Sequence, residues 1–183
     1  MLSIIGQALF FFLPSYFGNS MPVLLDRFKL FEGLNRPIDG GIRLRGQYVF
    51  GKTKTWRGII GGVIAGMFMA GFQAGLYYLF PQIHSWYLFA YNFPDVLLFG
   101  VLLGFGEGLG DAIKSFFKRR LNIASSMPFF PFDQFSFLGA LILGSFYYVP
   151  SVGHIFVIVI LSPIVPVFAN LVAFKLGWKK VWW

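Results

Sequence analysis

The sequence predicts an all-α integral membrane protein, a single polytopic domain over residues 1–183 with about five transmembrane helices. The chain is 57% hydrophobic and only 12% charged, and its mean hydropathy is +0.70, a composition that water does not solvate well. A helix needs roughly 20 apolar residues to cross a hydrocarbon core of about 30 Å. The stretches of suitable length are 2–25, 58–80, 94–114, 135–152 and 153–174.

The first three stretches have features beyond apolar length that support helices, whereas the last two are assigned by apolar length alone. The stretch 2–25 lacks the basic region and the cleavage site of a signal peptide, so we expect it to be a helix. The second and third stretches have small residues every four positions, which permit close contact between helix backbones. These residues are Gly58, Gly62, Gly66, Ala70 and Ala74, then Gly100, Gly104, Gly108 and Ala112. A tight helix pair would hold polar side chains at its inner ends in a fixed geometry.

The basic residues predict the orientation in the membrane. All 15 Lys and Arg fall on one side of a five-span topology: eight in 26–57, four in 114–120 and three in the tail, namely Lys175, Lys179 and Lys180. Because cytoplasmic loops hold the Lys and Arg, we expect the N-terminus outside, the C-terminus in the cytoplasm, and cytoplasmic loops at about 26–57 and 115–134. The net charge of +8 would then face anionic lipid headgroups or a polyphosphate, not nucleic acid.

A charged cassette lies at the inner end of the third stretch. At about 100° per residue, its polar side chains project within an arc of about 80°: Glu107, Asp111, Ser115 and Lys118. An interhelical salt-bridge cluster is the structural alternative, but ionisable groups within a membrane segment are candidates for function. An acidic residue followed by a hydroxyl and a basic triplet can hold magnesium and phosphates side by side. Glu107 lies one turn deeper and could support a ligand as well as serve as one.

The first cytoplasmic connection adds a second basic segment. Lys54, Trp56 and Arg57 precede the second stretch, where Trp and basic side chains commonly anchor a helix at the membrane interface. They could instead clamp a phosphate. The sequence Gly51-Lys52-Thr53 lacks the glycine spacing of a P-loop, and Asp39 with the two glycines after it indicates only a turn.

Taken together, these motifs resemble the archaeal CDP-archaeol synthases, CTP-dependent cytidylyltransferases related to the CDP-diacylglycerol synthases. The resemblance covers nearly the whole chain and rests on Asn19, 37–41, 54–58, Gly110, Asp111, Ser115, 118–120, Asp133, Gln134 and 137–140. The His-Gly-Gly element of the broader family is missing, which favours the archaeal branch. Ser136 stands where related archaeal sequences usually have a second Asp, so two metal-binding carboxylates on that loop are not expected.

The resemblance implies a reaction and roles for these residues. CTP would react with 2,3-di-O-geranylgeranylglyceryl 1-phosphate, giving the CDP-activated ether lipid and pyrophosphate. Asp111 and Asp133 would hold one or two Mg²⁺ ions, with Lys118 and Arg119 as further catalytic residues that neutralise phosphate charge. The remaining CTP or phosphate contacts would come from Ser115, Lys54, Arg57, Asp39, Asn19, Gln134 and Arg120, with a lipid headgroup as an alternative ligand of Arg120.

Three other functions are alternatives for a membrane protein of this kind. A small transporter or flippase could also have glycine-rich spans and intramembrane acids, but here the polar residues gather at one surface. A CDP-diacylglycerol synthase would use an ester phosphatidic acid in place of the ether lipid. A CDP-alcohol phosphotransferase would need an Asp-Gly-x-x-Ala-Arg motif, which is absent.

Overall fold

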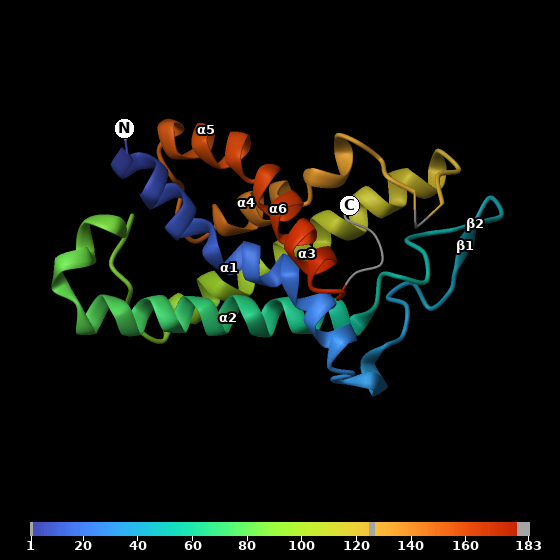
Figure 1. Ribbon diagram of the computed structural model, residues 1–183, viewed down its shortest axis with the longest axis horizontal. Coiled ribbons are helices and arrows are strands. Elements are labelled where there is room, and N and C mark those ends of the chain that lie inside the picture. Colours follow the sequence, from blue (N-terminus) through green and yellow to red (C-terminus); the bar gives the residue numbers. More distant parts are fainter. Residues whose placement is uncertain (1, 125–126, 179–183) are drawn as a thin grey trace.

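The computed structural model describes residues 2–124 and 127–178 and is mostly helical (Figure 1), which confirms the predicted class. The helices are α1 (Leu2–Arg27), α2 (Trp56–Leu79), α3 (Asp95–Arg120), α4 (Phe137–Gly144), α5 (Val152–Leu161) and α6 (Ile164–Lys175), with short 3-10 helices η1 (Glu32–Leu34), η2 (Pro81–Trp86) and η3 (Phe132–Gln134). Strands β1 (Arg43–Leu44) and β2 (Gln47–Tyr48) form an antiparallel hairpin. Lys179 and Lys180 of the predicted cytoplasmic tail lie outside the described residues.

Four helical stretches among the described residues are long and apolar enough to cross a membrane. They are Ser3–Arg27, Trp56–Leu79, Asp95–Arg120 and Val152–Lys175. The last is made of α5 and α6 with a break at Ser162 and Pro163, where proline removes a backbone donor from the helix. These stretches match four of the five predicted spans, and the chain is a multi-pass membrane protein.

The predicted span at 135–152 needs correction, because it does not form one helix. α4 has only eight residues, or about 12 Å at 1.5 Å per residue, and residues 145–151 continue without helix. Tyr147 there packs its ring 5.3 Å from that of Phe89, and Pro150 has no N–H to extend a helix. The apolar length of the segment does not indicate that residues 145–151 pack on aromatic rings without forming a helix.

The segment nevertheless runs along the bundle in the expected direction. α4 lies antiparallel to α3, with Gly139 against Gly106 and Gly144 against Leu103. Beyond it, His154 Nε2 lies 3.0 Å from Gln7 Oε1 near the start of α1. The chain therefore returns along the bundle between α3 and α5 without forming a further long helix.

The predicted small-residue stripes pack helix against helix. Gly66 of α2 and Gly100 of α3 face each other without room for a Cβ atom on either. One turn away, a Cβ on Gly104 would lie 2.4 Å from the carbonyl oxygen of Gly62, whereas a Cβ on Gly62 would be in ordinary contact with Gly104 at 3.4 Å. A Cβ on Gly18 of α1 would lie 3.3 Å from the Cα of Gly104. Three backbones thus meet here, which fixes the inner ends of α1, α2 and α3 relative to one another.

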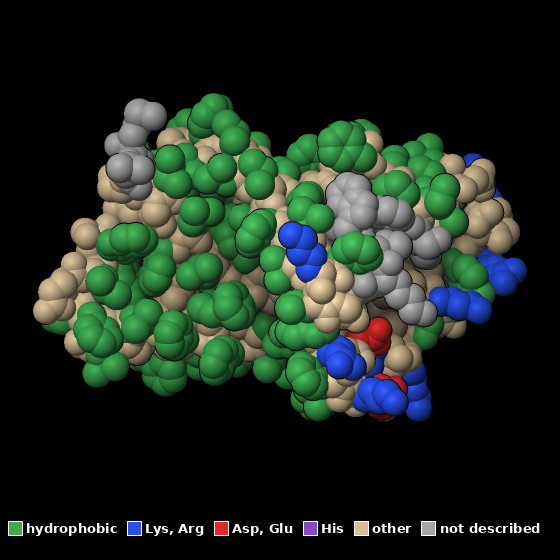
Figure 2. Space-filling model, in the orientation of Figure 1, with side chains coloured by type: hydrophobic (Ala, Val, Ile, Leu, Met, Phe, Trp, Pro, Cys, Tyr) green, Lys and Arg blue, Asp and Glu red, His purple; other side chains and the backbone are tan. Residues whose placement is uncertain are grey.

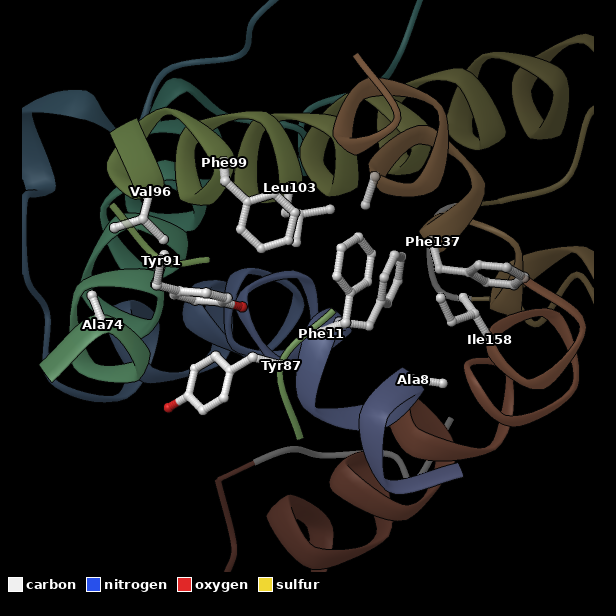
Figure 3. Close-up of a cluster of buried hydrophobic side chains, with 13 residues drawn as sticks. Ala8, Phe11, Ala74, Tyr87, Tyr91, Val96, Phe99, Leu103, Phe137 and Ile158 are labelled. Carbon is white, nitrogen blue, oxygen red and sulfur yellow. The ribbon is translucent and has the colours of Figure 1, made fainter. Parts of the chain in front are cut away.

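The buried apolar core lies away from the loops that follow α1 and α3. Figure 3 shows Phe11, Phe99, Leu103 and Tyr91 pointing toward one another from α1, α3 and the segment before α3. The rings of Phe11 and Phe99 are 5.0 Å apart, within the range of favourable aromatic contact. Aromatic side chains therefore fill this part of the bundle.

The surface also differs between the two ends. On the face in Figure 2, apolar side chains cover most of the bundle, and Lys and Arg gather at the end that carries the long loops. Exposed apolar residues on α2 and α3 include Phe68, Phe72 and Leu98. So large an apolar surface fits contact with lipid.

Candidate active site

A cavity of about 1640 Å³ lies between the inner parts of α1, α2, α3 and α6 and the loops that follow α1 and α3. The sequence-predicted residues that line it are Asn19, Lys54, Arg57, Glu107, Asp111, Ser115, Lys118, Arg119, Asp133 and Gln134. They come from segments far apart in the sequence. The two predicted site residues that do not line it are Asp39 and Arg120.

α3 supplies one wall of the cavity, and the predicted polar face is correct. The helix runs unbroken from Asp95 to Arg120, so it passes from the apolar core to the charged loops. Glu107, Ser115 and Lys118 are buried along this face. The basic residues of the last turn also lie at the end of the helix where its dipole favours positive charge.

Asp111 and Asp133 are linked through lysines. Asp111 pairs with Lys54 and, at 2.9 Å, with Lys114 Nζ. Asp133 Oδ2 lies 3.5 Å from Lys118 Nζ, and its Oδ1 lies 3.9 Å from Lys114 Nζ. The two carboxylates are brought to one place by η3 and the middle of α3, as their predicted shared role requires.

Lys114 is the residue that sequence reasoning missed. The basic-residue pattern places it only at the end of a span, although at about 100° per residue its side chain projects about 20° from that of Glu107. Its Nζ also donates to the backbone carbonyl of Asp133 at 2.8 Å. A helical-wheel projection that extends through the last turns of α3 includes Lys114 in the polar face.

Glu107 of α3 links its helix to neighbouring segments one turn deeper in the bundle than Asp111. Its Oε2 accepts a hydrogen bond from Ser15 Oγ of α1 at 2.8 Å, and the Ser136 side chain also hydrogen bonds with its carboxyl group. Both serines are buried. These contacts favour the supporting role over direct ligation and show that Ser136 faces Glu107.

The loop before α2 positions Lys54. Thr55 caps the helix, its Oγ1 accepting from Gly58 N at 3.3 Å, a common way to satisfy the first turn. Ile38 N donates to the carbonyl of Lys54 at 2.9 Å, and Pro37 pairs with Thr55 as a β-bridge. The backbone on both sides of Lys54 is therefore held in place.

Asp39 shapes this loop from outside the cavity. Its carboxylate accepts hydrogen bonds from Gly41 N at 2.9 Å, Phe50 N at 2.9 Å and Gly51 N at 3.3 Å. Burial alone would raise the pKa of Asp39, but these backbone donors outweigh it and hold the pKa below its usual value. Ionised Asp39 therefore stabilises the folded protein. This stabilisation is fully present above the unfolded-state pKa of about 3.9 and is lost as the pH falls through the lowered pKa of the folded state.

The other basic residues divide between the cavity and the loops. Arg57 is buried and pairs with Asp26 and, at 3.4 Å, with Glu32. Arg119 lines the cavity, and its Nη1 donates to the Ile123 carbonyl at 2.7 Å. Arg120 instead binds the hairpin.

Arg120 reaches three backbone carbonyls of the hairpin segment. The distances are 2.7 Å to Leu44, 3.3 Å to Gln47 and 2.7 Å to Tyr48, and the guanidinium lies 5.2 Å from the centre of the Phe116 ring. Its predicted phosphate or headgroup role therefore has no geometric support. It fastens the hairpin to the end of α3.

Two polar atoms near the cavity have no hydrogen-bond partner within the described part of the chain. They are Nε of Arg119 and Oε1 of Gln134, both buried. The side chains that carry them line the cavity, as does half-buried Asn19. The side chains of Arg119, Gln134 and Asn19 therefore add polar groups to the wall of the cavity.

The carboxylates that could hold a divalent cation are Asp111 and Asp133. No group of three or more His, Cys, Asp or Glu suited to a metal ion occurs in the described ranges. Mg²⁺ commonly takes only one or two protein carboxylates and completes its shell with water and substrate phosphates. The donor set therefore fits a cation that arrives with a phosphate ligand.

Comparisons with known proteins agree with this arrangement. A family model for CarS-like CDP-archaeol synthases matches residues 1–183. The CDP-archaeol synthase of Thermococcus gammatolerans is 39% identical over 184 residues, covering 100% of this chain and 98% of the relative. That of Methanococcus aeolicus is 34% identical and covers 94% of this chain and 93% of the relative.

A solved structure, described as an intramembrane enzyme for archaeal membrane lipid biosynthesis, shares the fold. It has a TM-score of 0.66 at 24% identity, over 90% of this chain and 92% of the solved one. The family match extends over the full sequence and includes the segments that meet at the cavity. The chain belongs to the CDP-archaeol synthase family.

Proposed function

We propose that this protein transfers the cytidylyl group of CTP to 2,3-bis-(O-geranylgeranyl)-sn-glycerol 1-phosphate, forming unsaturated CDP-archaeol and pyrophosphate. Membership of the CDP-archaeol synthase family supports the reaction. The observation that carries the site is the pair Asp111 and Asp133, joined through Lys114 at a cavity lined by further cations. CTP and an isoprenoid ether lipid phosphate are the substrates.

The reaction needs positioning and charge neutralisation more than a base. A phosphate oxygen of the lipid attacks the α-phosphorus of CTP, a new P–O bond forms, and the bond to the β-phosphate breaks to release pyrophosphate. The nucleophile is already anionic, so no side chain has to remove a proton. Catalysis then depends on holding the phosphates in line and stabilising their charge.

Asp111 and Asp133 would hold Mg²⁺. When bound, the ion supplies charge neutralisation and orientation for phosphate oxygens. Two partly exposed carboxylates, with 31% and 26% of their side chains exposed, leave room for phosphate and water to complete the shell.

The cations of the cavity would bind the phosphates directly. Lys118 and Arg119 lie on the last turns of α3 and suit the triphosphate and the departing pyrophosphate through charge-assisted hydrogen bonds. Ser115, one turn below, can donate its hydroxyl to a phosphate oxygen. Lys54 closes the site from the opposite loop.

The apolar part of the cavity supports a lipid substrate. Its lining passes from the charged loops to side chains of α1, α2 and α6, among them Val23, Ile59, Phe168 and Val172. A lipid phosphate could place its headgroup near Asp111 and its chains along these helices. A transporter would need polar groups through the bundle, whereas aromatic residues fill the other end (Figure 3).

We place the site at the cytoplasmic face of the cell membrane. The described basic residues of the long loops gather at the end that holds the cavity (Figure 2), and cytoplasmic loops carry most Lys and Arg. CTP is a cytoplasmic nucleotide, so this orientation gives it access.

The proposed function is tested with purified protein, labelled CTP, Mg²⁺ and either an ether or an ester lipid phosphate. Labelled CDP-archaeol from the ether lipid is expected. Product from the ester lipid alone would reassign the protein as a CDP-diacylglycerol synthase. Absence of any CDP-lipid from folded protein would contradict cytidylyl transfer.

A further inference from the structure

Lys114 lies between the two carboxylates of the proposed metal site. Its Nζ is 2.9 Å from Asp111 Oδ1, 3.9 Å from Asp133 Oδ1 and 2.8 Å from the carbonyl oxygen of Asp133. Its side chain is only 15% exposed. The ammonium group therefore already occupies a position where negative charge from two chain segments converges.

The other oxygen of each carboxylate faces a second lysine. Asp111 Oδ2 pairs with Lys54, and Asp133 Oδ2 lies 3.5 Å from Lys118 Nζ. Three ammonium groups thus face two carboxylates, and Lys114 alone touches both. Before any ligand arrives, the carboxylates are fully neutralised and the cluster has an excess of positive charge.

This arrangement opposes binding of a free divalent cation. Such an ion would have to compete with Lys114 for Asp111 and Asp133 and would add charge to a cluster that is already positive. A nucleotide triphosphate changes the balance, because its oxygens offer the displaced ammonium group a new partner and offset the added charge.

We propose that Lys114 is a resident cation that shields the two carboxylates and makes metal binding depend on nucleotide binding. The inference rests on the proposed role of Asp111 and Asp133. Lys114 is a positioning residue: it keeps the carboxylates facing each other in the free enzyme and turns to the phosphates when nucleotide and metal bind together. By thermodynamic reciprocity, CTP then strengthens metal binding and the metal strengthens CTP binding by the same factor.

The test measures Mn²⁺ binding, as a probe for Mg²⁺, by electron paramagnetic resonance on detergent-solubilised full-length protein. No lipid phosphate is present, so CTP stays intact. In the wild type, free Mn²⁺ should bind weakly and CTP should tighten it at least about tenfold. Lys114→Met should bind Mn²⁺ about tenfold more tightly without CTP, and CTP should then add little.

Two variants serve as controls. Lys114→Arg keeps the positive charge and should retain the weak Mn²⁺ binding without nucleotide. Lys175→Met removes an exposed lysine at the end of α6 and should match the wild type. If Lys114→Met does not fold, Lys114→Gln undergoes the same measurement with the same expected result.

The outcomes separate this inference from the proposed metal site. Unchanged or weaker Mn²⁺ binding in folded Lys114→Met or Lys114→Gln, together with loss of Mn²⁺ binding in Asp111→Asn, would overturn the role of Lys114 and leave the metal site intact. Mn²⁺ binding that is unaffected by both Asp111→Asn and Asp133→Asn would overturn the metal site itself.

Discussion

Asp111 is contacted from two sides, by Lys54 from the loop before α2 and by Lys114 from its own helix. Asp133, in η3, is contacted by Lys114 and Lys118, which both come from α3. Each carboxylate therefore keeps its orientation without a ligand, and each retains an exposed part that faces the cavity. At the scale of single residues, the two carboxylates are oriented before the substrates arrive, so binding has to move Lys114 but not the carboxylates.

Replacing a carboxylate of this pair should affect turnover more than folding. Asp111→Asn and Asp133→Asn keep the side-chain size but remove a hard anionic ligand, so we expect turnover to fall about 100-fold or more. CDP-lipid formation measures this, with melting temperature as the check on folding. Asp95→Asn, at the opposite end of α3, is the control and should keep wild-type turnover. Wild-type rates and Mg²⁺ response in both site variants would refute the metal assignment.

Arg119 should contribute to CTP affinity. A hydrogen bond between charged partners is worth about 1.5 to 3 kcal/mol, so Arg119→Ala should weaken CTP binding by about tenfold or more. Calorimetric titration of CTP into the folded proteins measures this affinity. Arg43→Ala removes an exposed guanidinium that contacts Tyr48 in the hairpin and should leave the affinity unchanged. Equal affinities of Arg119→Ala and the wild type would exclude Arg119 from the nucleotide site.

At the scale of elements, the sequence was informative where helical periodicity governs the arrangement. The polar face of α3 and the glycine contacts between α2 and α3 both follow from spacing. The break after α4 could not be foreseen, because apolar residues suit an extended segment packed on aromatic rings as well as a helix. The contact of Arg120 with Leu44 joins residues 76 positions apart, and no local pattern encodes it.

The glycine contacts predict a position-dependent effect within one helix. Gly66 of α2 faces the backbone of Gly100, whereas Gly75 of α2 has open space around it. Gly66→Ala should destabilise the protein by about 1 to 3 kcal/mol through overpacking, and Gly75→Ala should not. Thermal unfolding in detergent compares the two. Equal melting temperatures would show that α2 and α3 are not in backbone contact.

Arg120 should stabilise the hairpin instead of the nucleotide site. Arg120→Ala removes the three hydrogen bonds to backbone carbonyls of the hairpin segment, so the segment 41–51 should be cleaved faster in limited proteolysis. Mass spectrometry of the fragments locates the cut. Cleavage at the wild-type rate would mean that other contacts hold this loop, among them those of Asp39 and the hydrogen bond from Gln47 Nε2 to Asn122 Oδ1.

At the scale of the whole molecule, charge and hydrophobicity separate along the bundle. The basic side chains of the loops gather at one end (Figure 2). The cavity lies at the same end, and the aromatic core and the His84 and His154 side chains lie toward the other. The predicted topology requires five spans that cross the membrane in alternating directions. With no full helix at 135–152 it stays a prediction, although α4 and the residues after it return the chain to the start of α1.

This arrangement predicts which residues are accessible from outside an intact cell. The chain contains no cysteine, so single cysteines can report each end: Ser85→Cys and Ser151→Cys beside the start of α1, Asn35→Cys and Thr53→Cys in the loop between α1 and α2. All four positions are exposed. An impermeant thiol reagent should label the first pair in intact cells and the second pair only after permeabilisation, because the basic loop resists translocation. Labelling of the second pair alone in intact cells would place the cavity outside, where CTP cannot reach it, and would contradict both the orientation and the proposed access of the nucleotide.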